Sequence, residues 1–258
     1  MKKWIVVACL LFAVQSFAQY GDFMYLVTPG QVEKNQWRTK YESAYALRAV
    51  QPFGEDGLEQ RLGGVYGFSD NLNLSAVATT IFEKDDDNAI SSAQVELMYD
   101  FYNLKKYGLS FSVGGAWIRE FQAVQTAQTR LAASWVRGKW GTAANFVLQK
   151  PFADDRDAVD ILFSMGTNMQ LSKRFHLGVE FVSEDIEGFF EEEEAEGGAK
   201  LLLSPNIKML TESMQIRLGA GPIFYLTESD QSSMAPRVLP TVPDKNGWMV
   251  RLSAIYNI

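Results

Sequence analysis

The 258-residue chain has little of the chemistry on which many enzymes depend, since it contains one cysteine, Cys9, and one histidine, His176. Cys9 lies in an apolar run near the start of the chain. If that run is removed, the remaining protein can form no disulfide, thiolate metal site or catalytic thiol. Basic residues are also in deficit, with 24 against 31 acidic residues. We therefore expect no nucleic acid partner.

The first 18 residues, MKKWIVVACLLFAVQSFA, have the pattern of a secretory signal peptide. A basic start at Lys2 and Lys3 precedes an apolar run from Trp4 to Val14 and small residues at Ser16 and Ala18. The run is too short to cross a bilayer, which needs roughly 20 apolar residues. We predict cleavage after residue 18, so that residues 19–258 form the mature protein. Loss of two lysines leaves 22 basic residues against 31 acidic ones, a net charge of −9 (22 − 31).

The rest of the sequence lacks any apolar run long enough for a membrane-spanning helix. It has instead about twelve segments in which apolar and polar residues alternate, and a membrane-spanning β-strand needs only about 9 to 11 residues. These segments span approximately Gln36–Ala49, Leu58–Phe68, Leu72–Glu83, Ser91–Tyr102, Leu109–Glu120, Gln125–Trp135, Trp140–Lys150, Ala158–Met169, Phe175–Glu184, Gly198–Lys208, Met214–Leu226 and Gly247–Ile258. No linker or change in composition divides them, so we predict one domain.

Charged residues in these segments keep to one phase of the alternation. In the segment 175–184, Phe175, Leu177, Val179 and Phe181 occupy odd positions, while His176, Glu180 and Glu184 occupy even positions. A soluble β-sandwich would show the same alternation, with its polar face in water.

Large aromatic residues collect near the ends of the apolar phase, which favours a membrane barrel over a sandwich. They are Trp37, Phe68, Phe82, Phe101, Trp117, Trp135, Trp140, Phe224, Trp248 and Tyr256. Outer-membrane barrels place such girdles at both membrane interfaces.

Connection lengths also alternate, since joins such as SDN and VRGK are short and most of the others are long. In outer-membrane barrels the short turns are periplasmic and the long loops are external. We therefore predict an all-β protein: a single antiparallel transmembrane β-barrel of about 12 strands, starting near residue 36, in the outer membrane. Both termini are expected to be periplasmic and the apolar phase to face lipid.

The hairpin VYGFSDNLNLSAV, preceded by TPGQVEKNQW and LEQRLGG, carries a recognisable motif. It resembles the YG-x-[ST]-D-x-L-x-L hairpin of small bacterial outer-membrane barrels of the transporter-like type, including the phenol-degradation (MetA-pathway) group. The matching region runs from about Thr28 to Ala78. The resemblance implies a barrel of this size with a transport role.

The polar phase is expected to line the barrel interior. The predicted pore-lining residues are Arg38, Lys40, Glu42, Glu59, Arg61, Gln94, Glu96, Arg130, Asn145, Asp160, Glu180, Lys200, Arg217 and Arg251. Small residues on the same phase, among them Gly67, Gly114 and Gly219, should leave room for water, and Gly178 should accept serine. We predict a narrow channel or transporter for small solutes. A non-conducting structural or partner-binding barrel remains the alternative, with an outer-membrane hydrolase behind it.

A catalytic or metal site is not predicted. His176 begins its segment beside a short turn, far from the outer leaflet where barrel hydrolases meet lipid, and no second histidine could assist a serine nucleophile. The acidic loops lack the spacing of a Ca²⁺-binding loop. We therefore expect no cofactor and no catalytic residue.

Acidic residues concentrate in the long connections, where they would form an outer rim. They are Asp85, Asp86, Asp87, Asp154, Asp155, Asp157, Glu191, Glu192, Glu193 and Glu194. Phe189 and Phe190 beside this run could hold a partner protein or fill the barrel mouth. The proline-rich stretch 234–244 lies in the longest connection and is predicted to cover that mouth.

Overall fold

The structure of the protein is a computed structural model, which describes residues 23–30, 32–49, 56–83, 89–104, 108–120, 123–153, 159–184, 200–225 and 246–257. Twelve strands account for most of these residues. They are β1 Trp37–Leu47, β2 Gly57–Ser69, β3 Leu72–Glu83, β4 Ala89–Leu104, β5 Leu109–Arg119, β6 Gln125–Arg137, β7 Trp140–Pro151, β8 Asp160–Gln170, β9 Phe175–Glu184, β10 Lys200–Leu210, β11 Met214–Tyr225 and β12 Gly247–Asn257. Within the described ranges, no helix is long and apolar enough to span a membrane.

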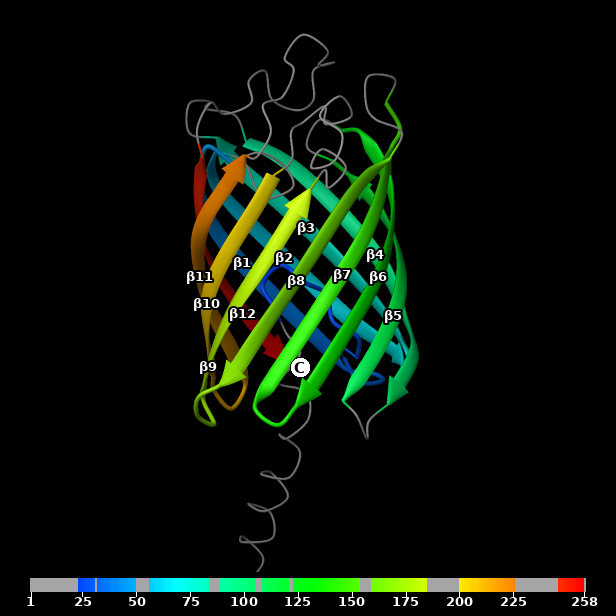
Figure 1. The fold of residues 1–258 in the computed structure, drawn as a ribbon. Helices are drawn as coiled ribbons and strands as arrows, with labels where there is room; N and C mark the ends of the chain where they lie inside the picture. Colours follow the sequence, from blue (N-terminus) through cyan, green and yellow to red (C-terminus); the bar gives the residue numbers. More distant parts are fainter. Residues whose placement is uncertain are drawn as a thin grey trace, which may run out of the picture.

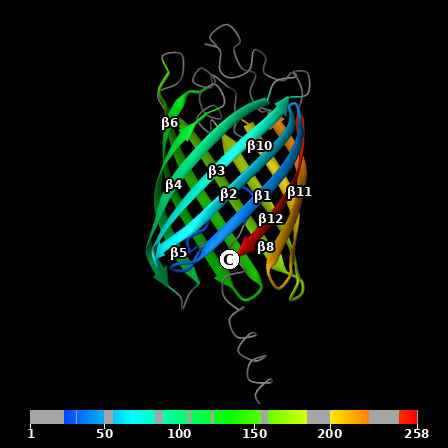
Figure 2. The same ribbon diagram turned by 180° about the vertical axis from the view of Figure 1, so that it is seen from behind.

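The strands form a closed antiparallel barrel in which each strand pairs with its neighbours in sequence (Figures 1 and 2). Closure is made by β1, which pairs with β2 through Trp37↔Tyr66 and with β12 through Arg38↔Asn257. Closure leaves no sheet edge with unpaired backbone groups, as a bilayer requires. The predicted barrel of about twelve antiparallel strands is confirmed.

The two ends of the barrel differ in the length of their connections. Residues 70–71, 105–108, 138–139, 171–174 and 211–213 join strands at one end, which we call the short-turn end. The opposite strand ends, such as Leu47, Glu83 and Glu184, form the other end, which we call the long-connection end because longer stretches of sequence separate most of its strands. The start of β1 and the end of β12 both lie at the short-turn end (Figure 1).

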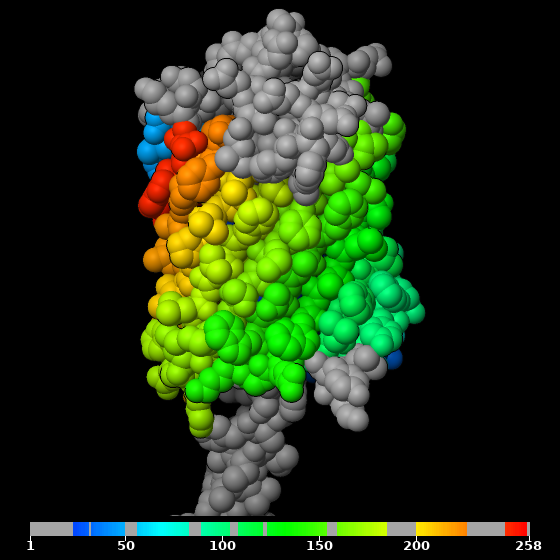
Figure 3. Space-filling view, in the orientation of Figure 1, coloured from blue at the N-terminus to red at the C-terminus, as the bar shows by residue number. Residues whose placement is uncertain are grey.

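The alternating sequence places apolar side chains outside the barrel and polar ones inside. In β9, Phe175, Leu177 and Val179 are exposed, whereas His176 and Glu180 are each 1% exposed. Large apolar side chains are exposed on the outside of every strand. Such an extensive apolar surface would be unfavourable in water. Figure 3 shows this outer surface as a continuous wall.

Exposed aromatic side chains form a girdle near each end of the barrel. Trp37, Phe68, Phe101, Trp135, Trp140 and Tyr256 lie near the short-turn end, and Phe82, Trp117 and Trp248 near the long-connection end. Trp117 also stacks on Phe152 with ring centroids 5.6 Å apart. Of the aromatic residues assigned to girdles from sequence, only Phe224 is half-buried. These rings match the interfacial belts of a membrane barrel.

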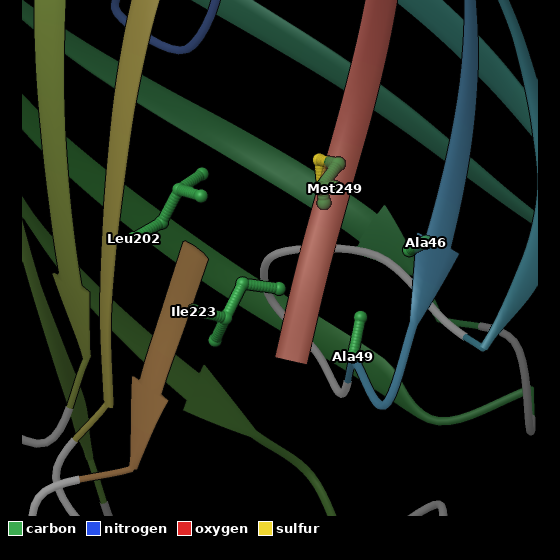
Figure 4. Close-up of a cluster of buried hydrophobic side chains, with 5 residues drawn as sticks. All are labelled: Ala46, Ala49, Leu202, Ile223 and Met249. Carbon is green, nitrogen blue, oxygen red and sulfur yellow. The ribbon is translucent and has the colours of Figure 1, made fainter. Parts of the chain in front are cut away.

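The interior is not polar throughout. Near the long-connection end, Ala46, Ala49, Leu202, Ile223 and Met249 form a buried apolar cluster contributed by β1, the residues after it, β10, β11 and β12 (Figure 4). Each of these side chains is at most 2% exposed. Arg251, Glu42 and Lys208 lie between this cluster and the short-turn end, whereas Lys200 and Glu184 lie beyond it toward the long-connection end.

Candidate functional site: the barrel lumen

The predicted pore-lining residues all lie on the inner phase of their strands. Arg38, Glu42, Glu59, Glu96, Asn145, Asp160, Glu180, Lys200, Arg217 and Arg251 are buried, and Lys40, Arg61, Gln94 and Arg130 are half-buried. Their position in the lumen follows from the strand phase. Their part in permeation remains a prediction.

A charge network joins β12, β1 and β2 across the point of barrel closure. Glu59 accepts a hydrogen bond from Arg251 at 3.0 Å and contacts Arg61 at 3.5 Å. Glu42 contacts Lys40 at 3.0 Å and lies 4.0 Å from Arg251. Charges of both signs thus compensate one another on this wall, as buried charges must.

A second polar network follows β4, β6 and β7. Arg130 donates from Nε to Glu96 at 2.7 Å and from Nη1 to the Asn145 side-chain oxygen at 3.1 Å. Gln128 also donates to Glu96, at 3.2 Å, and accepts a hydrogen bond from Gln149 at 2.8 Å. This network ends on Asn145, which faces the middle of the lumen.

Basic residues occupy adjacent positions on the wall formed by β9, β10 and β11. Lys208 is in register with His176 on one side and with Arg217 on the other, and all three are at most 2% exposed. Beyond them toward the long-connection end, Lys200 forms an ion pair with Glu184 at 2.7 Å. Each wall of the lumen therefore has its own charge pattern.

Residues 23–30, which precede the first strand, also lie in the lumen. Phe23, Met24 and Leu26 are 3–6% exposed and are covered by the barrel wall. The Arg251 guanidinium carbon lies 4.8 Å from the centre of the Tyr25 ring, a cation–π distance. Tyr25 also contacts the apolar cluster near the long-connection end.

This segment corrects the expectation that small lumen residues leave room for water. A Cβ at Gly219 would lie 3.0 Å from the Met24 sulfur, and one at Gly67 would lie 2.2 Å from the Glu33 carbonyl oxygen. At Gly114, a Cβ would meet the Met98 sulfur at 2.1 Å. These glycines make room for protein atoms.

The structure adds two features to the predicted lumen. Asp100 lies in the polar phase of its segment with Gln94 and Glu96 but is not among the predicted pore-lining residues, and it accepts a hydrogen bond from the Gly30 backbone N–H at 2.9 Å. The apolar run FMYLV at residues 23–27 was not assigned to any element. An apolar run outside any strand, too short to span a membrane, is a signal for a buried segment of this kind.

Other predicted features fall outside the described residues. They are the signal peptide, all ten residues of the acidic outer rim, Phe189 and Phe190, and the proline-rich stretch 234–244. In the part of the chain that the structure describes, no group of three or more His, Cys, Asp or Glu side chains is placed to hold a metal ion.

Comparisons with known proteins identify the fold. No family model and no curated protein sequence matches the chain. Among solved structures, the KdgM porin superposes with a TM-score of 0.58 at 10% sequence identity, covering 85% of this chain and 98% of the porin. The KdgM porin in complex with disordered oligogalacturonate gives a TM-score of 0.59 with the same identity and coverage. The protein therefore has the fold of an outer-membrane β-barrel porin.

Proposed function

We propose that the protein is an outer-membrane channel for small solutes. The observation that carries this proposal is the division of one closed wall into an apolar outside and a charged inside. Buried acidic and basic side chains on the inner phase are costly unless water or other charges solvate them. A structural barrel of this width could be filled with apolar side chains at lower cost.

The membrane orientation follows from the two ends of the barrel. We place the short-turn end, with the start of β1 and the end of β12, in the periplasm and the long-connection end outside the cell. The basic residues Arg137, Lys139, Lys173 and Arg174 are exposed at the short-turn end. The expected signal peptide would direct the chain through the inner membrane, and outer-membrane lipid would then contact the girdles.

The charge pattern of the lumen favours a channel for small solutes of either charge over one for solutes of a single charge. The KdgM structure includes an acidic oligosaccharide, whereas this lumen carries acidic and basic groups in paired networks. The hairpin within Thr28–Ala78 further supports the finer assignment to the MetA-pathway-like type. We propose no catalytic role, since His176 is in register with Lys208 and Gln170 on the lumen wall.

One observation favours a second candidate, a barrel that does not conduct at rest. The segment 23–30 is hydrogen-bonded to Lys40 on β1 and to Asn145 on β7, which lie on opposite walls of the twelve-stranded barrel. A structural or partner-binding barrel, with a partner protein at the long-connection end, would keep such a segment in place permanently.

A solute uptake assay tests the proposal. Purified protein is placed in liposomes, and swelling is followed after addition of sugars and amino acids of increasing size. We expect uptake that falls with solute size, and no uptake with heat-denatured protein. Equal permeability of protein-containing and empty liposomes to every solute would favour the non-conducting barrel.

A further inference from the structure

The segment 23–30 is held in the lumen by side chains of four strands that contact its main chain. Glu180 on β9 accepts hydrogen bonds from the backbone N–H of Met24, at 2.9 and 3.0 Å, and of Tyr25, at 2.8 Å. On the opposite side, Lys40 on β1 donates to the Met24 carbonyl oxygen at 3.3 Å. The first residues of the segment are therefore bonded on both sides.

The same kind of contact continues along the segment. The Asn145 side chain on β7 accepts from the Val27 N–H at 2.8 Å and donates to the Val27 carbonyl oxygen at 2.7 Å. Asp100 on β4 accepts from the Gly30 N–H at 2.9 Å. A paired contact to both groups of one residue imitates the bonding of a neighbouring β-strand. Every residue has a main-chain N–H and carbonyl group, except that proline lacks the N–H, so this arrangement recognises peptide backbone.

The wall is also shaped to fit the segment. A Cβ at Gly166 would lie 2.8 Å from the Phe23 ring, and a Cβ at Gly219 would lie 3.0 Å from the Met24 sulfur. Phe23 and Leu26 pack on Ala143, a small residue of β7. Side chains of the segment thus occupy positions where the wall has small residues.

The attachment of the segment allows it to leave without opening the barrel. Its bonds to the wall come from side chains and are separate from the strand ladders. After residue 30, the chain is fixed to β2, where Asn35 donates its N–H to the Gly67 carbonyl oxygen at 2.7 Å. Gly30 lies between these parts with φ of 70°, a conformation that glycine adopts without strain.

We propose that the lumen contains a binding site for a peptide segment, formed by Asp100, Asn145, Glu180 and Lys40, and that residues 23–30 occupy it as an internal plug. The plug narrows the conducting path, and release from the site widens it. This inference rests on the proposed channel function for its effect on conductance, while the binding site itself does not depend on conduction.

A reversible crosslink tests whether the docked segment limits conduction. The variant carries Met24→Cys and Gly219→Cys, and the only native cysteine, Cys9, lies in the expected signal peptide. Oxidation should link the two positions, as seen by a gel shift of the protein without reductant. Dithiothreitol should then raise conductance about twofold or more, because one extended segment fills a large share of a twelve-strand lumen. The single-cysteine variants should not respond.

Loss of the docking groups should have a similar effect without a crosslink. Glu180→Ala leaves the N–H groups of Met24 and Tyr25 without their acceptor, which disfavours the docked state. Its control is Glu184→Ala, on the same strand, which also removes a buried carboxylate, one that is ion-paired with Lys200. We expect higher mean conductance for Glu180→Ala than for Glu184→Ala, with both barrels resisting denaturation by cold SDS.

Peptide binding provides a readout that conduction does not affect. In a full-length variant with residues 24, 25 and 27 replaced by proline, which removes the N–H groups that Glu180 and Asn145 accept, a labelled peptide FMYLVTPG should bind in detergent with saturable fluorescence anisotropy. A peptide with Val27→Pro lacks the N–H that Asn145 accepts and should bind about tenfold more weakly, a loss of about 1.4 kcal/mol in binding free energy. The Val27→Ala peptide keeps that N–H and should bind nearly as well as the native sequence.

The outcomes separate this inference from the channel function. If the cysteine pair fails to crosslink and the peptide fails to bind, the peptide site is wrong, whatever the barrel conducts. If the crosslink forms but reduction leaves conductance unchanged, the plug does not control the path. If the peptide binds as expected while no variant conducts, the site stands and the channel function fails.

Discussion

Arg251 shows how a single buried charge is accommodated in this lumen. Its side chain is 2% exposed, donates to Glu59 at 3.0 Å and lies over the Tyr25 ring. Arg61 belongs to the same network, but its side chain is 32% exposed and its nearest carboxylate contact is 3.5 Å. The charge of Arg251 must therefore be compensated almost entirely by protein groups, whereas water solvates part of the charge of Arg61.

We predict that Arg251→Ala lowers the free energy of unfolding by about 3 to 5 kcal/mol, because the buried Glu59 carboxylate loses its hydrogen-bond donor and keeps only the longer contact to Arg61. Arg61→Ala, the matched control, should cost about 1 kcal/mol or less, as expected for a partly solvated pair. Urea unfolding in micelles, followed by tryptophan fluorescence, measures both. Equal losses for the two variants would show that burial does not set the strength of these pairs.

The adjacent residues Gln94 and Val95 test which side of the wall faces lipid. Val95 is 50% exposed on the outside, while Gln94 is half-buried on the lumen side. Val95→Arg should cost about 2 to 4 kcal/mol near the bilayer midplane, whereas Gln94→Arg should be mild. The measurement is the fraction of folded barrel on cold SDS gels after refolding into liposomes. Similar folding of both variants would contradict the assignment of inside and outside.

Individual residues also mark the limit of the sequence pattern. Alternation assigned Gly178 correctly to the lumen and suggested that serine would fit. The structure shows that a Cβ there would lie 2.9 Å from the Asn206 side-chain oxygen and 3.0 Å from the Thr167 carbonyl oxygen. Asn206 in turn donates to Glu180 at 3.1 Å. Alternation predicts the face of a residue but carries no information on the space in front of it.

At the scale of elements, the alternation predicted the strands closely. The segments Leu72–Glu83 and Phe175–Glu184 coincide with β3 and β9. The predicted segment Gly198–Lys208, which contains Pro205, forms β10, and Pro205 pairs in register with Val179. In a barrel wall, lipid and lumen impose opposite preferences on successive residues, so the period is a direct physical consequence of the fold.

The plug is the element that the sequence did not predict. Its residues have no periodicity, and its bonds reach across the lumen to residues such as Glu180, which is 156 positions away from Met24. Local patterns reflect local environments, whereas this segment is ordered by distant side chains. The apolar run FMYLV indicates a buried segment, but the place of that segment in the lumen follows only from the closed barrel.

The connection between β11 and β12 carries an element-scale prediction. It contains the proline-rich stretch, which lies outside the described residues, but the strand ends on either side are already in register through Ile223↔Gly247. Deletion of residues 232–241 should therefore leave the barrel folded, since the entropic cost of closing a flexible loop depends only weakly on its length. We expect conductance or solute uptake to rise if the stretch covers the outer mouth. Unchanged values for both would leave it as a loop without a role in permeation.

At the scale of the whole molecule, charge distribution predicts ion preference. The described lumen carries both signs in paired networks, whereas the sequence concentrates acidic residues in the long connections. Carboxylates around a low-dielectric mouth raise the local cation concentration. An open pore should therefore prefer cations at low salt. The preference should fade as the Debye length falls from about 10 Å at 0.1 M to about 3 Å at 1 M.

The reversal potential across a KCl gradient measures this preference, for the native protein and for a variant with Glu191 to Glu194 changed to Gln. The variant should be less cation-selective at low salt and similar to the native protein at high salt. Anion preference at low salt would show that the acidic rim does not determine ion selectivity. A cation preference that neither high salt nor the Gln substitutions change would show the same.

The central claim is that this twelve-stranded barrel encloses a conducting path that residues 23–30 restrict. Single-channel recording in a planar bilayer tests it most directly, with the native protein and the Glu180→Ala variant measured under the same conditions. The account predicts discrete conductance steps for the native protein and larger or more frequent openings for the variant. Silent bilayers for both proteins, with gels showing that both are folded barrels, would contradict it.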